Sequence, residues 1–550
     1  MGRVDRERAV RSTAIASSSR MRAALVLTGL VVFAGCASGS PLVASGSGGD
    51  GGAGATADGG SPVGSSQATD PFARWRAERA LRQRDLDAYL AANESGLRAL
   101  LYAPLGTFGI PRTTFDAFTT VMPDRWGPPE EKLAAVGLGP DLHDPSNPLP
   151  LGIATFEAGG SELVIFSCAA CHVGRVIGPD GNEQLLFGAP NTRFDAVFTA
   201  FEDAAADPRY AQLGGGLVAQ TVKEALLLRR QVEERTIGGL TYDRGTTPNA
   251  PDPFATDRRG FFDSYAVIFA MRTLPESLLP GTNATLAAIM PPVPGEADIM
   301  SLWRQRARPV AEWDGSLPDP VYRNLAASIG AVGLSGAVSF DTAYEVAQLA
   351  RDLPSPPYPF DVDGERAARG ADLFQRYCAS CHHDGTSEIF PTSLTGTDPN
   401  RARAVTQQGR DRLLTALRNA CTDSAVCDVP DERVVADPSS GFVRGYMALP
   451  LHGIWARAPY LHNGSVPTLR HLLVPSSRPT GFFRGAIHYD EDDVGFVWDS
   501  AATREKYVDW FDTRLAGRSN AGHSSAVFLG IDWGSHPEEL ADLLEYLKTL

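Results

Sequence analysis

The sequence predicts a mostly α-helical protein with long irregular connections and little β-structure. Residues 71–102 repeat apolar positions at helical spacing among mixed charges. The final stretch, SHPEELADLLEYLKTL, places its leucines on one face of a helix, and Ser535 and Glu538 have the spacing of a capping box at its start. Between these ends, proline- and glycine-rich stretches such as 139–152 and the proline-dense segment 353–364 predict irregular structure.

The bulk composition is that of a globular chain with a sizeable core. Of its 550 residues, 43% are hydrophobic and 21% are charged. The formal net charge is −15, and no run of lysine and arginine occurs outside the N-terminus. Binding to nucleic acid needs a concentrated basic face, so a nucleic-acid partner is excluded.

The N-terminus has the features of an export signal. Several arginines precede the apolar run AALVLTGLVVFA (23–34), which is too short to span a bilayer and is typical of the hydrophobic region of a signal peptide. The run ends in FAGC, which resembles a bacterial lipobox and implies lipidation of Cys36. Residues 37–70 are rich in Gly, Ser and Ala and lack an apolar period, which predicts a disordered tether. We expect a lipid-anchored protein in the periplasm or at the outer membrane of a Gram-negative bacterium.

Two short motifs share one pattern, C-x-x-C-H. The first is CAACH, with Cys168, Cys171 and His172. The second is CASCH, about 210 residues later, and the whole chain has only seven cysteines. Its residues are Cys378, Cys381 and His382. A repeat of this kind in a chain so poor in cysteine indicates a shared chemistry.

Three chemistries compete for this pattern. A zinc ribbon needs its two cysteine pairs about 15–20 residues apart, and a thioredoxin-like dithiol needs a βαβ context. Covalent attachment of haem c uses all three residues: two thiols bond the vinyl groups of one porphyrin, and the adjacent imidazole becomes an axial iron ligand. The sequence therefore predicts two covalently bound haem c groups. The remaining pair, Cys421 and Cys427, predicts a short-loop disulfide.

The sixth iron ligands decide between electron transfer and oxygen chemistry, because only an iron with an open face binds dioxygen or peroxide. For the C-terminal haem the candidates are His523, Met447 and His462. No histidine occurs between residues 173 and 381, which favours an open face at the N-terminal haem, although Met271, Met290 and Met300 remain candidates.

Longer stretches resemble known haem proteins. GERAARGADLFQRYCASCH resembles the N-terminal helix of class I cytochromes c, with Gly370 and Phe374 at packing positions. LHGIWARAPYLHNGSVPTLRHLL (451–473) is similar to a segment of the bacterial cytochrome c peroxidase superfamily and, within it, of the rubber oxygenase (RoxA-like) branch of extracytoplasmic di-haem dioxygenases. The stretch 296–331, with Trp313, Asp314 and Gly315, resembles a segment of the same superfamily, and SNAGH near the C-terminus resembles the rubber-oxygenase ending.

This resemblance implies a division of labour between two haems. It makes His523 the sixth ligand of the C-terminal haem, leaves the N-terminal iron open, and offers Trp313 as an electron relay. We expect a lipoprotein signal peptide over 1–36, a disordered tether over 37–70, an N-terminal haem c domain with helical and loop extensions over 71–352, and a C-terminal cytochrome c domain over 353–550.

The expected activity is that of an oxidoreductase acting on dioxygen or peroxide, either a di-haem oxygenase or a cytochrome c peroxidase-like enzyme, with a redox protein or the small oxidant as partner. The alternative is a non-enzymatic electron carrier in which both irons are six-coordinate. The chain is shorter than the rubber oxygenases, so their substrate is not carried over.

Overall fold

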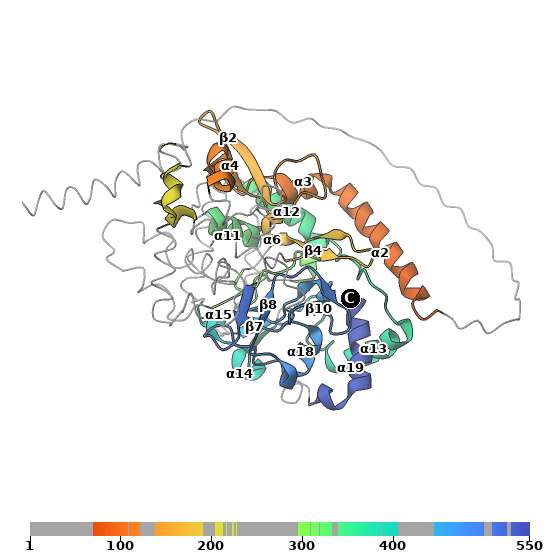
Figure 1. The fold of residues 1–550 in the computed structure, drawn as a ribbon. Coiled ribbons are helices and arrows are strands. Elements are labelled where there is room, and N and C mark those ends of the chain that lie inside the picture. The colour runs from red at the N-terminus through yellow and green to blue at the C-terminus, as the bar shows by residue number, and fades with distance from the viewer. Residues whose placement is uncertain are drawn as a thin grey trace, which may run out of the picture. The chain divides into compact units, whose positions relative to one another are not determined.

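The computed structural model describes residues 70–107, 109–121, 138–190, 204–212, 216, 220, 223, 224, 227, 295–308, 310–317, 320–332, 339–386, 388–404, 445–499, 509–524 and 530–550 (Figure 1). The leader with Cys36, the tether, and the pair Cys421 and Cys427 lie outside these residues, so their predicted roles stay predictions. None of the described helices is long and apolar enough to cross a membrane.

Helices and short antiparallel strands alternate along the described chain. The α-helices are α2 (Ala73–Ala92), α3 (Glu94–Tyr102), α4 (Arg112–Val121), α6 (Ala169–His172), α11 (Pro320–Val332), α12 (Phe340–Asp352), α13 (Gly364–Tyr377), α14 (Thr392–Thr395), α15 (Asn400–Ala404), α18 (Leu469–Leu473) and α19 (Pro537–Lys548). The 3₁₀ helices are η2 (Pro208–Gln212), η4 (Gln305–Ala307), η7 (Ile454–Arg457), η8 (Pro475–Ser477) and η10 (Trp533–Ser535).

The strands are β1 (Ile110–Pro111), β2 (Ile153–Ala158), β3 (Ser161–Phe166), β4 (Val173–Ile177), β5 (Glu183–Phe187), β6 (Ile389–Pro391), β7 (Gly445–Met447), β8 (Gly481–Arg484), β9 (Tyr489–Asp490), β10 (Gly495–Phe496) and β11 (Asp509–Asp512). In the described part they form one three-stranded sheet, in the order β1-β3-β2, and the pairs β4-β5, β6-β7, β8-β11 and β9-β10. The two predicted haem domains stay a prediction.

The predicted helical segment 71–102 forms two helices, α2 and α3, which meet at Asn93. The Asn93 side chain donates a hydrogen bond to the carbonyl of Tyr89 at 2.8 Å, which satisfies an acceptor at the end of α2. The helix α2 is anchored by Trp75, which is buried and whose indole N–H donates to the carbonyl of Phe360 at 2.9 Å.

The proline-dense segment between α12 and α13 is buried. Leu353, Tyr358 and Val362 are almost fully inaccessible to solvent, and the Tyr358 ring packs edge-on against Trp455 with 5.5 Å between ring centres. These side chains belong to one apolar core that contains residues from both before and after the segment. The boundary predicted at residue 353 therefore falls at a packed connection.

A β-hairpin with a two-residue turn leads into the first cysteine motif. Strands β2 and β3 pair antiparallel from Ile153 opposite Phe166 to Ala158 opposite Ser161. The turn residues Gly159 and Gly160 both have positive φ angles, 60° and 77°, which only glycine adopts readily and which match a type I′ turn. The apolar run before Cys168 thus forms β3.

Helices α13 and α19 cross at Gly370 and lie side by side in Figure 1. A methyl group at Gly370 would overlap the backbone carbonyl of Asp542, so the close approach requires a residue without a side chain. Phe374 packs against Tyr546 with ring centres 5.3 Å apart, and Arg369 forms a two-pronged ion pair with the Asp542 carboxylate at 2.7 and 2.8 Å. The packing roles expected for Gly370 and Phe374 are therefore present.

The predicted leucine face of the last helix is confirmed, with Leu540, Leu543, Leu544 and Leu547 buried. The capping box predicted for Ser535 and Glu538 is wrong. The helix begins at Pro537, and the Ser535 hydroxyl donates instead to the Asp532 carboxylate at 2.9 Å. A proline at the first helical position needs no hydrogen-bond partner for its nitrogen, which removes one demand on the cap.

We expect Gly370→Ala to lower the free energy of unfolding by about 2 kcal/mol, because the added methyl group forces α13 and α19 apart. Gly364→Ala is the matched control in the same helix, since a methyl group there meets atoms no closer than 3.5 Å. Denaturant titrations of both variants measure the effect. Equal midpoints would contradict the close crossing at Gly370.

Candidate functional site

The second cysteine motif lies in one helical turn directly after α13. Asp363 caps the start of this helix, because its carboxylate accepts hydrogen bonds from two backbone N–H groups of the first turn, both at 3.0 Å. After the helix, the backbone N–H groups of Cys381 and His382 donate to the carbonyl of Cys378, at 3.1 and 3.0 Å. This turn brings two thiols and an imidazole to one place.

The backbone orients the imidazole of His382. Its Nδ1 lies 2.8 Å from the carbonyl oxygen of Leu449. Because a carbonyl only accepts, Nδ1 carries the proton and Nε2 keeps its lone pair. Burial lowers the pKa of His382, so the ring is neutral, which is the form that binds a metal ion.

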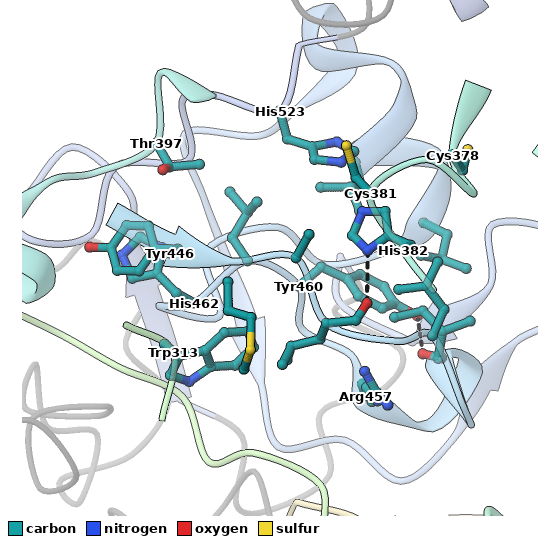
Figure 2. A pocket seen from close by; sticks show the side chains of 18 of the residues that line it. Trp313, Cys378, Cys381, His382, Thr397, Tyr446, Arg457, Tyr460, His462 and His523 are labelled. Carbon is teal, nitrogen blue, oxygen red and sulfur yellow. Dashed lines mark hydrogen bonds between the residues drawn. The ribbon is translucent and has the colours of Figure 1, made fainter. Parts of the chain in front are cut away.

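His523 faces His382 with 6.2 Å between ring centres and 51° between ring planes (Figure 2). An iron bonded to one nitrogen of each ring at about 2 Å would separate the ring centres by about 6 Å. Directly stacked rings are much closer: Tyr446 and His462, in the same cavity, are 3.8 Å apart. The spacing of the pair therefore fits an iron between two imidazoles.

A close backbone approach holds the loop that carries His523. Gly522 and His523 have φ angles of 88° and 47°, and a methyl group on Gly522 would overlap the backbone of Thr397. The His523 N–H donates to the carbonyl of Thr395 at 2.9 Å, and Arg478 donates to the carbonyl of Gly522 at 2.8 Å. Burial, followed by the neighbouring His382 and Arg478, lowers the pKa of His523 to about 4, so this ring is also neutral.

These side chains line one cavity of about 200 Å³. Apolar residues from several separate segments make up most of its wall. Its chemically distinctive lining residues are Trp313, Cys378, Cys381, His382, Tyr446, Met447, Arg457, His462 and His523 (Figure 2). A flat apolar group carrying a metal ion, such as a porphyrin, suits this lining.

The structure brings all three sequence candidates for the sixth ligand to this cavity. Met447 is buried in β7, opposite Ile389 of β6. His462 stacks on Tyr446, and burial lowers its pKa to about 3. Its Nε2 is buried and has no hydrogen-bond partner among the described residues. The ring paired with His382, however, is that of His523.

The first cysteine motif has the same backbone turn. The N–H groups of Cys171 and His172 donate to the carbonyl of Cys168, at 3.2 and 3.0 Å, and residues 169–172 form the short helix α6. The hairpin packs closely on this turn, since a methyl group at Gly152 would come within 2.7 Å of the Ala170 Cα. Both motifs thus present two cysteines and a histidine from one turn.

The surroundings of His172 differ from those of His382. His172 is 8% exposed, and burial and then the Arg323 guanidinium lower its pKa well below the usual value. Arg323 Nη1 lies 3.4 Å from His172 Nε2, and Arg323 Nε lies 3.6 Å from the Glu312 carboxylate. An iron about 2 Å from Nε2 therefore requires the Arg323 side chain to shift to one side. With that shift, the donor set fits a haem c attachment site.

The Trp-Asp-Gly motif lies between the two histidine turns. The Trp313 ring lines the larger cavity, and its indole N–H donates to the carbonyl of Asp298 at 2.7 Å. Asp314 forms a buried ion pair with Arg401 at 2.9 Å, and Gly315 has a positive φ of 63°. Each residue of the motif therefore has a separate structural role, and the electron-relay role of Trp313 stays a prediction.

Met300, one of the candidate ligands of the N-terminal haem, lies at the cavity beside His382 and also at the small cavity beside Arg323. Its side chain packs with Met447 and Val310, and it lines the large cavity and also a smaller one beside Arg308, Glu312 and Arg323. The candidates Met271 and Met290 lie outside the described residues.

The sequence analysis missed three arginines at the site, Arg308, Arg323 and Arg457. Arg457 stands in the motif WARAPYLHNG, but nothing in a sequence distinguishes a buried guanidinium from an exposed one. Burial, and then the positive charges of Arg457 and Arg323, lower the pKa of Arg308 to about 9. Burial likewise lowers the pKa of Arg457 to about 10.

Comparisons with known proteins give partial matches. Residues 445–484, which include β7 and His462, match a family described as RoxA-like, cytochrome c-like. Residues 98–172, which end at the first motif, match a Y4iN-like domain. The first match supports a cytochrome c relationship and a haem-binding redox function.

Two uncharacterized proteins of Sinorhizobium fredii (strain NBRC 101917 / NGR234) are similar to the chain. The protein y4iM is 37% identical over an alignment of 284 residues, which covers 47% of this chain and 66% of that protein. The protein y4iJ is 28% identical over an alignment of 314 residues, which covers 44% of this chain and 52% of that protein. The chain thus spans less than two thirds of either relative, and it is related to cytochrome c-like proteins through the segment that forms part of the His382 cavity wall.

Proposed function

We propose that this chain is an exported di-haem c-type oxidoreductase, anchored to a membrane through a lipid on Cys36. One observation carries the proposal: a cysteine pair and its histidine open onto an apolar cavity in which a second imidazole stands 6.2 Å from the first, measured between ring centres. This arrangement suits a covalent haem with two histidine ligands. The repeat of the same turn at Cys168 supports a second haem.

The protein's own groups have clear tasks in holding the haems. The two thiols of each motif would hold a haem through thioether bonds, each S–H adding across one vinyl group with the sulfur on one carbon and the hydrogen on its neighbour. His382 is held in the correct tautomer by the Leu449 carbonyl, and His523 closes the opposite face. A bound haem supplies one-electron redox chemistry, and two histidine ligands restrict the C-terminal haem to that role.

The N-terminal haem is the proposed place of oxygen or peroxide activation. Among the described residues, the group beside His172 Nε2 is the Arg323 guanidinium, which is a hydrogen-bond donor and no iron ligand. Once it has moved aside for the iron, a donor of this kind would support an oxygen ligand bound on an open face. Trp313, whose ring lines the cavity of the C-terminal haem site, is the proposed electron relay.

The alternative is an electron carrier with both irons six-coordinate. Met300 gives it specific support, because this residue lines the small cavity beside Arg323 and has a sulfur able to bind iron. The number of high-spin haems in the oxidised protein separates the two functions.

We expect two haems per chain when the protein is produced in a host that matures c-type cytochromes. Cys378→Ala/Cys381→Ala should remove one haem, and Cys168→Ala/Cys171→Ala the other, because each pair forms the thioether bonds of one group. The pyridine haemochrome assay measures the ratio of haem to protein. Cys421→Ala/Cys427→Ala is the control and should keep both haems; an extractable or absent pigment in the wild-type protein contradicts the proposal.

We expect His523→Ala to convert one low-spin haem to high-spin and to raise its midpoint potential, because the iron loses a nitrogen ligand that stabilises its ferric state. His462→Gln is the matched control, as its ring lines the same cavity but stacks on Tyr446. Electron paramagnetic resonance and optical spectra measure the spin states. If His462→Gln gives the high-spin signal and His523→Ala does not, the ligand assignment is reversed.

We expect one high-spin haem in the oxidised wild-type protein, because the N-terminal iron keeps an open face. Two purely low-spin haems would identify an electron carrier instead. Oxygen uptake with an unsaturated hydrocarbon, compared with peroxide turnover in the presence of a reduced cytochrome, then distinguishes an oxygenase from a peroxidase.

A further inference from the structure

The buried and partly buried arginines around the site fall into two groups. Most are balanced by carboxylates at hydrogen-bonding or ion-pair distance. The balanced pairs are Arg518 with Glu296, Arg484 with Asp298, Arg323 with Glu312, and Arg401 with Asp314. Arg457 and Arg308, in contrast, have no carboxylate within 4 Å among the described residues, although both lie at the cavities.

Arg457 is only partly satisfied by the protein. Two of its nitrogens donate to the carbonyls of Pro450 and His452, at 3.0 and 2.6 Å, while its Nε is buried without a partner among the described residues. Arg478, in contrast, uses all three of its nitrogens as donors: its Nε and both terminal nitrogens donate hydrogen bonds to backbone carbonyls. The Arg457 guanidinium also lies over the Trp303 ring, with 5.9 Å between Cζ and the ring centre, but no carboxylate stands beside it among the described residues, so an anion bound there would be stabilised.

The position of Arg457 indicates what kind of anion this is. Figure 2 shows Cys378 and Cys381 toward the top of the cavity and Arg457 toward the bottom. In a haem, the two propionate carboxylates lie on the porphyrin edge away from the vinyl groups that cysteines bond. A group attached at the cysteines therefore has its carboxylates directed toward the end of the cavity that holds Arg457.

We infer that Arg457 binds a propionate carboxylate of the C-terminal haem, and that Arg308, beside His172 and Arg323, has the same role for the N-terminal haem. This inference depends on the proposed function, since it requires covalent haem. Carboxylate and guanidinium form a charge-assisted hydrogen bond, which is the strongest kind that the site offers. The pairing would also orient His382, because Arg457 holds the carbonyl of Pro450, next to Leu449.

The haem midpoint potentials test this role in the full, haem-loaded protein. We expect Arg457→Met to lower the potential of the bis-histidine haem, because a positive charge beside the propionate disfavours the ferric state. At a fixed solution potential, the ratio of oxidised to reduced haem should rise about tenfold, which corresponds to a midpoint shift of about 59 mV for one electron. Arg457→Lys keeps the charge and should shift the potential much less.

Arg306→Met is the matched control. Arg306 lies in the short helix η4, which ends directly before Arg308. Its side chain is 66% exposed and pairs with Asp352 on the surface. Its loss therefore changes the net charge by the same amount without affecting a haem. Resonance Raman spectra give a second readout, because the propionate bending band shifts when a carboxylate loses a hydrogen bond. We expect that shift in Arg457→Met and not in Arg306→Met.

If Arg457→Met does not fold, Arg308→Met still tests the inference. Among the described residues, Arg308 donates to just one carbonyl, that of Ser301, so its replacement removes few contacts. It should lower the potential of the other haem. Wild-type potentials and Raman bands in these variants, with both haems present by pyridine haemochrome, would overturn the inference and leave the proposed function intact. A preparation without haem would instead refute the proposed function.

Discussion

Four buried ion pairs fix an irregular segment, residues 295–317, on which the rest of the site depends. The pairs join Glu296 to Arg518, Asp298 to Arg484, Glu312 to Arg323 and Asp314 to Arg401. The segment contains little regular structure, so few backbone ladders stabilise it. Removing one partner of a buried pair costs about 3–5 kcal/mol, because the other charge stays buried. All four arginines follow the segment in the sequence. The segment's own residues Asp298 and Trp313 line the large cavity, so the ion pairs fix part of the cavity wall.

This segment is linked to the axial histidine through a short chain of contacts. The carbonyl of Trp313 accepts a hydrogen bond from the N–H of Met447 at 2.8 Å, and two residues further on the carbonyl of Leu449 holds His382. The position of the imidazole thus depends on the Trp-Asp-Gly motif as well as on its own helix. A coupling of this kind explains how a residue remote in sequence takes part in orienting a metal ligand.

The two histidine turns differ in what stands beside the metal-binding nitrogen. His382 faces an imidazole, whereas His172 lies beside a guanidinium. A second imidazole closes an iron to other ligands, and a guanidinium donates hydrogen bonds to a ligand that has already bound. The proposed division between an electron-storing and an oxygen-binding haem follows from this difference in side chains.

The sequence by itself determined the features that are local in the chain. The spacing of Cys378, Cys381 and His382 is a property of one turn, and the leucine face of α19 is a property of a periodic pattern. The resemblance favoured His523, but the chain's own pattern left Met447 and His462 as rivals, and only the tertiary structure brought the His523 ring, about 140 residues away, to face His382. It also revealed that, among the described residues, Arg457 and Arg308 lack the carboxylate partner that the buried arginines have, since the distance between two charges arises from folding and leaves no pattern in the sequence.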